Sequence, residues 1–368
     1  MFYTTITHKK GVYGALHHTK DMITISLCMI VKNEESILAR CLDTVADLMD
    51  EIIIVDTGST DRTKEIAAKY TDKIYDFQWI DDFSAARNFS FSKATMDYIY
   101  APDADEILDE ENRTRFKILK KCMLPEIEMV QMKYVTVSED GSLLNAKKEY
   151  RPKLFKRLRT YTWIDPIHET VRIDPVVFNS DIEIIHKPLA LHGKRDFRIF
   201  LKEYAAQGKL SDKLYRMYAQ QLLKMGEPED FIKAYAIFQE LWQLNPLSDR
   251  GKEAACVLAR HYRLSNDPAN LFKYALRDMM ETPCSEMCYD LGAYYQAQGD
   301  YDEAIVWYLN AAYETVSIID IHCSGDLPLQ GLVHCYKELA AITQNPQYQE
   351  MATHYDTELS QWQMPEEL

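Results

Sequence analysis

The sequence lacks an excess of basic residues, and this absence narrows the classes of partner. Its 368 residues include 42 Lys and Arg against 57 Asp and Glu, which gives a formal net charge of −15 at pH 7. Such a surface repels nucleic acid and anionic lipid, so we expect neither as a partner. An anionic small molecule remains compatible, because a metal ion and a few Lys or Arg side chains neutralise it locally.

Long apolar runs are also missing. No run approaches the roughly 18 residues that a transmembrane helix needs, so none is predicted. Residues 1–21 lack the apolar segment and cleavage site of a secretory signal peptide, and we treat them as an ancillary N-terminal tail.

Several sequence motifs are absent as well. No CxxC pair occurs among the eight cysteines, so a zinc site built from Cys284, Cys288, His322 and Cys323 is disfavoured. Buried thiols in a reducing cytoplasm fit the scattered positions better, and we expect a cytoplasmic protein. Neither GxGxxG nor GxxxxGK[ST] is present, which disfavours a dinucleotide-binding fold and a P-loop.

What is present first is an alternation of strands and helices. Residues 23–31 and 51–56 are nearly continuous apolar runs of β-forming residues, typical of strands buried on both faces. Shorter strands are predicted at 73–77 and 97–101, with helical spacing between the strands. This order predicts an α/β domain with a mostly parallel sheet. From 127 to 191 the pattern becomes strand-like, which we interpret as an antiparallel extension of the same domain.

Polar clusters follow three of these strands. They are Asn33-Glu34-Glu35, Asp56-Thr57-Gly58 and Asp103-Ala104-Asp105. Open parallel sheets bind ligands at the carboxyl ends of their strands, so the clusters are expected to converge. Asp103 and Asp105 alternate on an extended backbone, which lets both carboxylates face one cleft. Two such oxygens suit Mg²⁺ or Mn²⁺ carrying a diphosphate, although a turn or cap before a helix at about 110–121 is the alternative.

Beyond residue 195 the strand signal ends, and residues 197–364 show amphipathic helices separated by short breakers. Residues 285–316 match the tetratricopeptide pattern of large and small packing positions. The matching residues are Leu291, Gly292, Tyr295, Ala304, Tyr308 and Ala311. We predict three or four helix pairs stacked into a solenoid, with an unrelated helical bundle as the alternative.

Four motifs in order carry a family resemblance: residues 26–35, 51–63, 83–88 and 102–106. With them, residues 23–195 resemble the family 2 glycosyltransferases of the GT-A fold. The similarity is to the soluble bacterial branch that includes lipopolysaccharide-core glucosyltransferases and sublancin-type peptide S-glycosyltransferases. The expected organisation is a tail at 1–21, a GT-A domain at 22–195 and a TPR-like domain at 196–368.

The resemblance implies a nucleotide-sugar site. Asp56 matches the aspartate that accepts a hydrogen bond from a uracil ring, and a helix cap is its alternative role. Arg87 and Asn88 match a pair near the donor phosphates, where an Arg fork suits phosphate oxygens. The remaining donor-binding residues that it implies are Val31, Asn33, Glu35, Asp103 and Ala104.

The resemblance also implies a metal site. Asp105 matches the direct metal ligand, and Asp103 faces the ribose or the metal. His186 matches a histidine that completes the metal site, with a buried core histidine as the structural alternative. His192 is the other candidate histidine, and Lys194 or Arg195 would clamp the diphosphate as a lid.

An inverting transfer needs a base that takes the acceptor's proton. Glu169 is the candidate, because the element Trp163-x-x-x-x-His168-Glu169 sits at the acceptor side in the family. Many relatives have a Glu-Asp pair there and this chain has none, so Asp165 is a rival. Trp163 provides an apolar platform for the sugar or is a core residue. The basic run 151–159 either lines the same cleft or is a solvated strand face, and we favour the solvated strand face.

Together these features predict a metal-dependent inverting glycosyltransferase that uses a nucleotide sugar, most simply a UDP-sugar. Mn²⁺ or Mg²⁺ would stabilise the leaving diphosphate. The helical half would hold the acceptor, which we expect to be a peptide or protein. A glycan or lipid-linked acceptor, and an inactive repeat scaffold that only binds nucleotide sugar, are the alternatives. The oligomeric state stays open, with a homodimer as one option.

Overall fold

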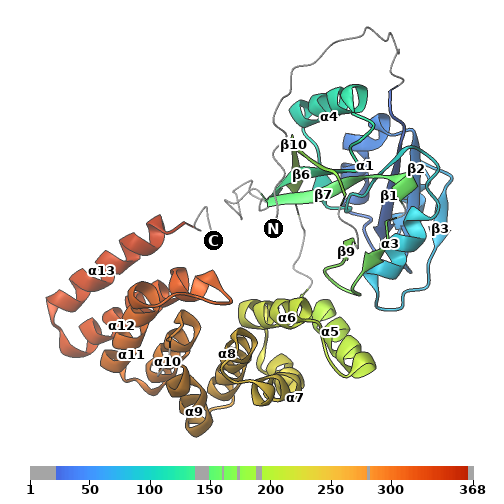
Figure 1. The fold of residues 1–368 in the computed structure, drawn as a ribbon. Coiled ribbons are helices and arrows are strands. Elements are labelled where there is room, and N and C mark those ends of the chain that lie inside the picture. Colours follow the sequence, from blue (N-terminus) through green and yellow to red (C-terminus); the bar gives the residue numbers. More distant parts are fainter. Residues whose placement is uncertain are drawn as a thin grey trace, which may run out of the picture.

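The computed structural model describes residues 22–136, 149–159, 161–171, 175–187, 193–279 and 282–363 (Figure 1). The expected tail at 1–21 and His192 lie outside the described residues, as do the side chains of Lys194 and Arg195. No helix in the described ranges combines the length and the apolar character needed to cross a bilayer.

The first half alternates strands and helices as expected. Its early elements are β1 (Ile25–Val31), α1 (Leu38–Val45), β2 (Glu51–Asp56), α2 (Thr63–Ala67), β3 (Ile74–Asp76), α3 (Phe83–Phe91) and β4 (Tyr98–Tyr100). The later ones are β5 (Glu106–Ile107), α4 (Glu110–Cys122), β6 (Met129–Thr136), β7 (Glu149–Lys156), β8 (Trp163–Ile164), β9 (Thr170–Val171) and β10 (Val177–His186).

Eight of these strands form one sheet in the order β3-β2-β1-β4-β7-β6-β10-β5. The first four are parallel, as predicted. Strand β7 is antiparallel to both β4 and β6, but β10 is parallel to β6, so the antiparallel extension is wrong for that pair. The reason is that the chain leaves the sheet after β7 and makes the separate β8-β9 hairpin. It therefore returns to β6 by a crossover and not by a tight turn.

The sheet lies between two layers of helices. Ile25, Leu27 and Met29 of β1 pack with α1 and α4 on one face. On the other face Cys28 and Ile53 share a cluster with the phenylalanines of α3. Burial on both faces explains why β1 and β2 are apolar along nearly their whole length.

The second half is entirely helical in the described residues. Its helices are α5 (Gly193–Gln207), α6 (Asp212–Met225), α7 (Pro228–Leu244), α8 (Asp249–Leu264), α9 (Pro268–Met279), α10 (Ser285–Gln298), α11 (Tyr301–Leu309), α12 (Asp326–Thr343) and α13 (Pro346–Gln361). Helices α6, α8, α10 and α12 contact one another in that order. Among the described helices after α5, sequence neighbours also pack against each other: α7 with α8, α8 with α9, α10 with α11, α11 with α12 and α12 with α13. This stacking agrees with the predicted repeat architecture (Figure 1).

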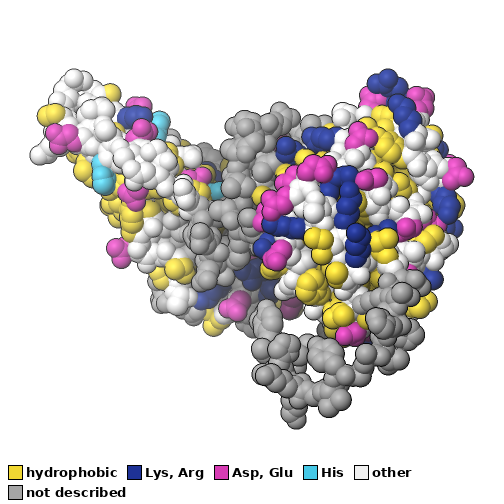
Figure 2. All heavy atoms as spheres, turned by 90° about the horizontal axis from the view of Figure 1, so that it is seen from above, with side chains coloured by type: hydrophobic (Ala, Val, Ile, Leu, Met, Phe, Trp, Pro, Cys, Tyr) yellow, Lys and Arg dark blue, Asp and Glu magenta, His cyan; other side chains and the backbone are white. Residues whose placement is uncertain are grey.

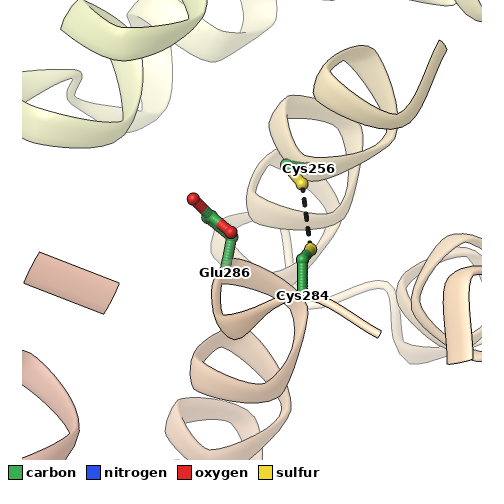
Figure 3. Close-up of side chains that lie close together, drawn as sticks. All are labelled: Cys256, Cys284 and Glu286. Carbon is green, nitrogen blue, oxygen red and sulfur yellow. Dashed lines mark hydrogen bonds between the residues drawn. The ribbon is translucent and has the colours of Figure 1, made fainter. Parts of the chain in front are cut away.

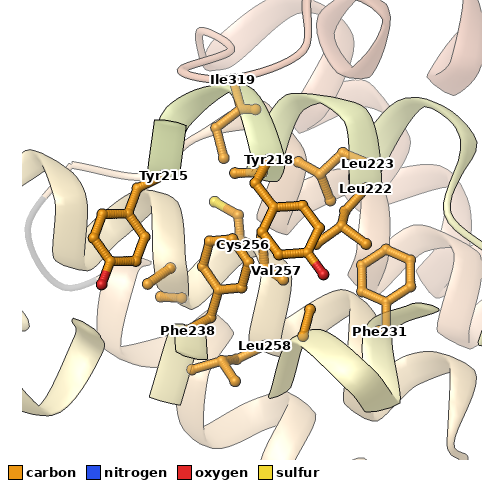
Figure 4. Close-up of a cluster of buried hydrophobic side chains, with 14 of the residues drawn as sticks. Tyr215, Tyr218, Leu222, Leu223, Phe231, Phe238, Cys256, Val257, Leu258 and Ile319 are labelled. Atoms are coloured by element: carbon orange, nitrogen blue, oxygen red, sulfur yellow. The ribbon is translucent and has the colours of Figure 1, made fainter. Parts of the chain in front are cut away.

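Aromatic residues fill the seams of this stack. Figure 4 shows Tyr218, Phe231 and Phe238 packed between α6, α7 and α8, where each side chain is buried. Further along, the ring of Tyr308 lies between two glycines of neighbouring helices, Gly292 and Gly331. This explains why the repeat pattern pairs a large residue with small ones.

Two thiols meet at the seam between α8 and α10. Cys256 and Cys284 have their Sγ atoms 3.6 Å apart, with Glu286 beside them (Figure 3). The Glu286 carboxylate accepts backbone N–H groups of Ile318 and Ile319 at 2.9 and 2.7 Å. Its role in the described structure is therefore to hold that loop. This cluster differs from the zinc site that the sequence analysis disfavoured, because Cys284 lies beside Cys256 and Glu286 here.

Charged side chains are spread over the first half. On the face of the molecule shown in Figure 2, basic and acidic side chains of the first half are interspersed. The net negative charge therefore does not gather into a single patch on this face.

Replacing Gly331 with Ala tests the packing of Tyr308. A Cβ atom at Gly331 would lie 2.4 Å from the Tyr308 ring, which has no room to move between two helices. We expect the free energy of unfolding to fall by about 1–3 kcal/mol, measured by urea denaturation of the helical signal. Ile342→Ala, at an exposed position of the same helix, is the control. Equal stability of the two variants would contradict the proposed packing.

Glu51→Gln tests a buried acid that joins β1, β2 and the loop before β4. Burial opposes ionisation, but hydrogen bonds from Lys73, Ser26 and Thr95 outweigh it and lower the pKa of Glu51 to about 2. A pKa below the unfolded value means stability that is present above about pH 4.5 and lost as the pH falls toward 2.

The variant should therefore be less stable than the natural chain at pH 7, and the difference should shrink at pH 4 and again at pH 3. Urea unfolding at the three pH values measures it. Glu126→Gln, at an exposed loop position, is the matched control and should show a constant difference. A pH-independent difference for Glu51→Gln would contradict the assigned ionisation.

Candidate active site

The loops after β1 and β2 contact each other directly. Asn33 has a positive φ of 57°, and its Oδ1 accepts the backbone N–H of Thr60 at 2.8 Å. Glu35 Oε2 accepts the backbone N–H of Arg62 at 3.0 Å. The first two predicted polar clusters therefore converge at the carboxyl ends of the parallel strands.

Asp56 ends β2 beside Val31 of β1. Its Oδ1 accepts the backbone N–H groups of Gly58 and Ser59 at 3.0 and 2.9 Å. Its Oδ2 is buried and has no hydrogen-bond partner in the described structure. A buried acceptor without a donor costs about 1–3 kcal/mol, so this oxygen is suited to a ligand N–H.

Asp105 and His186 come together from distant elements. Asp105 follows β4, and its Oδ2 lies 3.0 Å from Nε2 of His186, the last residue of β10. Its Oδ1 is buried and has no partner in the described structure. Ala104, between the two aspartates, is buried in the apolar cluster of β1 and α1, so its side chain packs the loop.

The Arg87 guanidinium connects two parts of the site. From α3, its Nη2 donates to Asp103 Oδ1 at 2.9 Å and its Nε donates to Glu169. Burial alone would raise the pKa of Asp103, but the charges of Arg87 and Lys153 outweigh it and hold that pKa well below its usual range. Arg87 therefore links the aspartate motif to the candidate base.

Asn88 and Trp163 hold each other. Asn88 Nδ2 donates to the Trp163 carbonyl at 3.0 Å, and the Trp163 N–H donates to Asn88 Oδ1 at 2.9 Å. The indole packs edge-on against Phe91 and Phe155 and is only 8% exposed. In the described structure both residues thus anchor the segment around 163, and the Trp163 ring is part of the core.

Sequence reasoning missed Lys153. It lies within the run 151–159 that we interpreted as solvated, yet it is 6% exposed and donates to Glu106 Oε1 at 2.6 Å. Its Nζ is also 3.9 Å from Asp103 Oδ2. The interpretation is wrong here because β7 lies inside the sheet, antiparallel to β4, so Lys153 and Leu154 meet the carboxyl end of β4.

Glu106 is a further buried acid beside the motif. Burial, together with the charges of Asp103 and Asp105, raises the pKa of Glu106 to about 7 against the opposing effect of Lys153. The signal in the sequence that could have identified Glu106 as a site residue was its position directly after Asp105.

The two candidate bases have different partners. Glu169 pairs with Arg87, and no described residue donates to its second oxygen. Asp165 Oδ2 lies 3.2 Å from Lys213 Nζ of α6, at the junction with the helical half. Glu169 is thus the acid that shares a cation with Asp103.

The charges at the strand ends are unbalanced. Four carboxylates lie together against the two buried cations Arg87 and Lys153: those of Asp103, Asp105, Glu106 and Glu169. Burying unpaired anions is costly, and Asp105 Oδ1 is a buried oxygen without a donor. Hard carboxylate oxygens and a net negative charge fit Mg²⁺ or Mn²⁺, with Asp105, Asp103 and His186 as the available ligands.

Comparisons with known proteins match part of this chain to a family. Residues 26–168 match the family described as "Glycosyl transferase family 2". This range contains β2 to β8 and all of β1 except Ile25. The candidate residues that lie outside it are Glu169, His186, His192, Lys194, Arg195 and Lys213.

Three curated relatives illustrate the similarity. A TPR repeat-containing protein of Synechococcus elongatus is 49% identical over 26% of this chain and 24% of its own length. Glycosyltransferase SunS of Bacillus subtilis, from the prophage SPbeta, is 34% identical over 32% of this chain and 29% of its own length. An uncharacterized glycosyltransferase of Rickettsia typhi is 29% identical over 47% of this chain and 59% of its own length. Each match therefore spans less than two thirds of the relative's own length.

Among solved structures, one similar chain is glucosyl-3-phosphoglycerate synthase from Mycobacterium tuberculosis, in complex with Mn²⁺ and UDP-glucose. It is 15% identical, with a TM-score of 0.35, over 52% of this chain and 81% of its own. A score at this level carries no argument about function. The motifs, the sheet and the match at residues 26–168 together identify a family 2 glycosyltransferase domain in this chain.

Proposed function

We propose that the chain is a metal-dependent inverting glycosyltransferase that moves a sugar from a UDP-sugar to an acceptor held partly by the helical half. One observation carries the proposal. Two buried carboxylate oxygens without donors, Asp56 Oδ2 and Asp105 Oδ1, follow two parallel strands of a family 2 glycosyltransferase domain. Asp56 Oδ2 is suited to accept an N–H group of the nucleotide base, and Asp105 Oδ1 is suited to bind a cation.

Asp56 would recognise the base. Its Oδ1 is saturated by two backbone N–H groups, so the carboxylate cannot rotate away from the position that exposes Oδ2 to a ligand. The N3–H of uracil is a donor that fits such an acceptor. Val31, Asn33 and Glu35 would form the neighbouring wall, since their loop is fastened to the loop after Asp56.

Asp105, Asp103 and His186 would hold Mn²⁺ or Mg²⁺. When bound, the ion would neutralise charge on the leaving diphosphate. Asp105 is the stronger ligand candidate, because Asp103 is already engaged by Arg87 while Asp105 Oδ1 has no donor. Arg87 would orient Asp103 and Glu169 together, and Asn88 would act by holding the backbone of Trp163.

Glu169 would take the proton of the acceptor. It is held by the same guanidinium as Asp103, so it stands beside the donor cluster, and no described residue donates to its second oxygen. Asp165 is the weaker candidate, because its carboxylate is paired with Lys213 at the junction.

The stacked helices of the second half would bind the acceptor. Stacked helix pairs curve into an extended surface, and such a surface fits a peptide or an unfolded protein segment. A cytoplasmic location is part of the proposal and rests on the scattered cysteines.

Donor hydrolysis tests the site before any acceptor is known. Purified protein with Mn²⁺ is incubated with a panel of UDP-, GDP-, ADP- and TDP-sugars, and released nucleoside diphosphate is measured. We expect slow release from one donor and none after EDTA. Asp105→Asn should reduce release by about 100-fold or more, because the substitution removes the negative charge and one of the two carboxylate oxygens that would bind the cation.

Asp181→Asn is the matched control, since Asp181 is an exposed aspartate on β10 whose side chain is 85% exposed. It should behave like the natural chain. If no nucleotide binds in a metal-dependent manner and no donor is hydrolysed, the transferase proposal is wrong and the repeat half is the functional part.

Asp56→Asn tests base recognition. The amide can still accept from Gly58 and Ser59, but it then presents an NH₂ group to the base. UDP binding should weaken by about 1–3 kcal/mol, or roughly 5- to 150-fold, while CDP, whose N3 is an acceptor, should gain relative to UDP. Isothermal titration with both nucleotides measures this exchange of preference. Unchanged UDP binding would show that Asp56 does not contact the base.

A further inference from the structure

The segment 163–171 carries Glu169 in an unusual backbone conformation. Asp165 and His168 have positive φ angles of 71° and 50°, although neither is a glycine. A residue other than glycine is strained in this conformation, which persists only when surrounding contacts enforce it. The backbone conformation of segment 163–171 therefore depends on its contacts with neighbouring elements.

The transferase half holds one side. The N-terminal end of α3 contacts the turn, where the Phe83 N–H donates to the Pro166 carbonyl at 2.9 Å and the Ser84 hydroxyl donates to the Asp165 carbonyl. One turn further along α3, Arg87 holds Glu169. These contacts tie the segment to the helix that also reaches the aspartate motif.

The helical half holds the other side. Lys213 of α6 donates to Asp165 Oδ2 at 3.2 Å and to the His168 carbonyl, so one ammonium spans the whole turn. Gln221, two turns later on α6, contacts His168 Nε2 through its Nε2 at 2.7 Å. The imidazole of His168 also stacks on Phe200 of α5, with ring centroids 6.1 Å apart.

The contact includes shared core. Ile167, between the two strained residues, is 3% exposed and belongs to the buried cluster of α5 to α8, together with Phe200 and Tyr218. Figure 1 shows the β9 region between the sheet and helices α5 and α6. The turn is thus packed into the helical half and not merely placed next to it.

We infer that α5 and α6 form a clamp that positions Glu169 for transfer, with Lys213 and Gln221 as positioning residues that act through the turn 165–168. The inference rests on the proposed function, in which Glu169 is the base. The helical half would then have a second task besides acceptor binding, because it fixes the last side chain that the reaction needs. Lys213 would also neutralise the charge of the Asp165 carboxylate, so that Asp165 does not act as the base.

Lys213→Met tests the clamp in the full chain, because it keeps the length of the side chain and removes the ammonium. We expect donor hydrolysis to fall by about 10- to 100-fold in kcat, since a misplaced catalytic group costs that much. The dissociation constant for UDP with Mn²⁺ should stay within about twofold. Lys213→Arg should recover most of the turnover, because a guanidinium can also span the turn.

Lys202→Met is the matched control. Lys202 is a junction lysine of α5 that donates to Asp81 and to the Ile80 carbonyl, and among the described residues it makes no hydrogen bond or ion pair with the segment 163–171. Arg198 would keep Asp81 paired in that variant. It should turn over like the natural chain. Amide hydrogen exchange of residues 163–171 should rise in Lys213→Met and not in Lys202→Met.

The possible failures are distinguishable. If the natural chain hydrolyses donor and Lys213→Met does so equally well, the clamp is wrong while the transferase proposal stands. The clamp is equally wrong if Lys202→Met loses as much turnover, or if Lys213→Met loses UDP binding in parallel. If Glu169→Gln turns over normally, the assignment of the base fails and this inference fails with it. A natural chain that neither binds UDP nor hydrolyses any donor overturns the proposed function itself.

Discussion

The ion pairs of Arg87 are the interaction on which the site depends. One largely buried guanidinium contacts Asp103, which follows β4, and Glu169, which lies between β8 and β9, so it joins two acids that lie far apart in the sequence. Removing one partner of such a group leaves the other charges buried and unpaired, which costs about 3–5 kcal/mol. The same group lies over the Trp163 ring at 5.1 Å, so charge and core packing are joined at this residue.

The sheet order determines which charges meet at this place. Because β7 lies between β4 and β6, the buried cation Lys153 reaches the carboxyl end of β4, where Asp103 and Glu106 follow. Because β10 is parallel to β6, its last residue, His186, reaches the same edge. The acidic motif is therefore flanked by groups from two strands, β7 and β10, that lie far from it in the sequence.

Local patterns were sufficient for much of this structure. Apolar runs located β1 and β2, and the repeat pattern located Gly292 and Tyr308 in their buried seam. The contact between the loops that carry Asn33 and Asp56 followed from one rule about parallel sheets. Lys153 was missed because its burial depends on which strands flank β7, and that pairing is not written in the spacing of residues 151–159. The direction of β10 was missed for the same reason, since a crossover and a hairpin leave similar alternation in the strand itself.

The burial of Ile167 among the residues of α5 to α8 bears on how modular the two halves are. A cut near residue 195 would leave this apolar side chain in water and would remove Lys213 and Gln221 from the turn. The smallest transferable unit would then include α5 and α6, with the join to another repeat array placed after Met225. Helices α5 and α6 belong structurally to both halves, and a change in the number of later repeats would leave the transferase site intact.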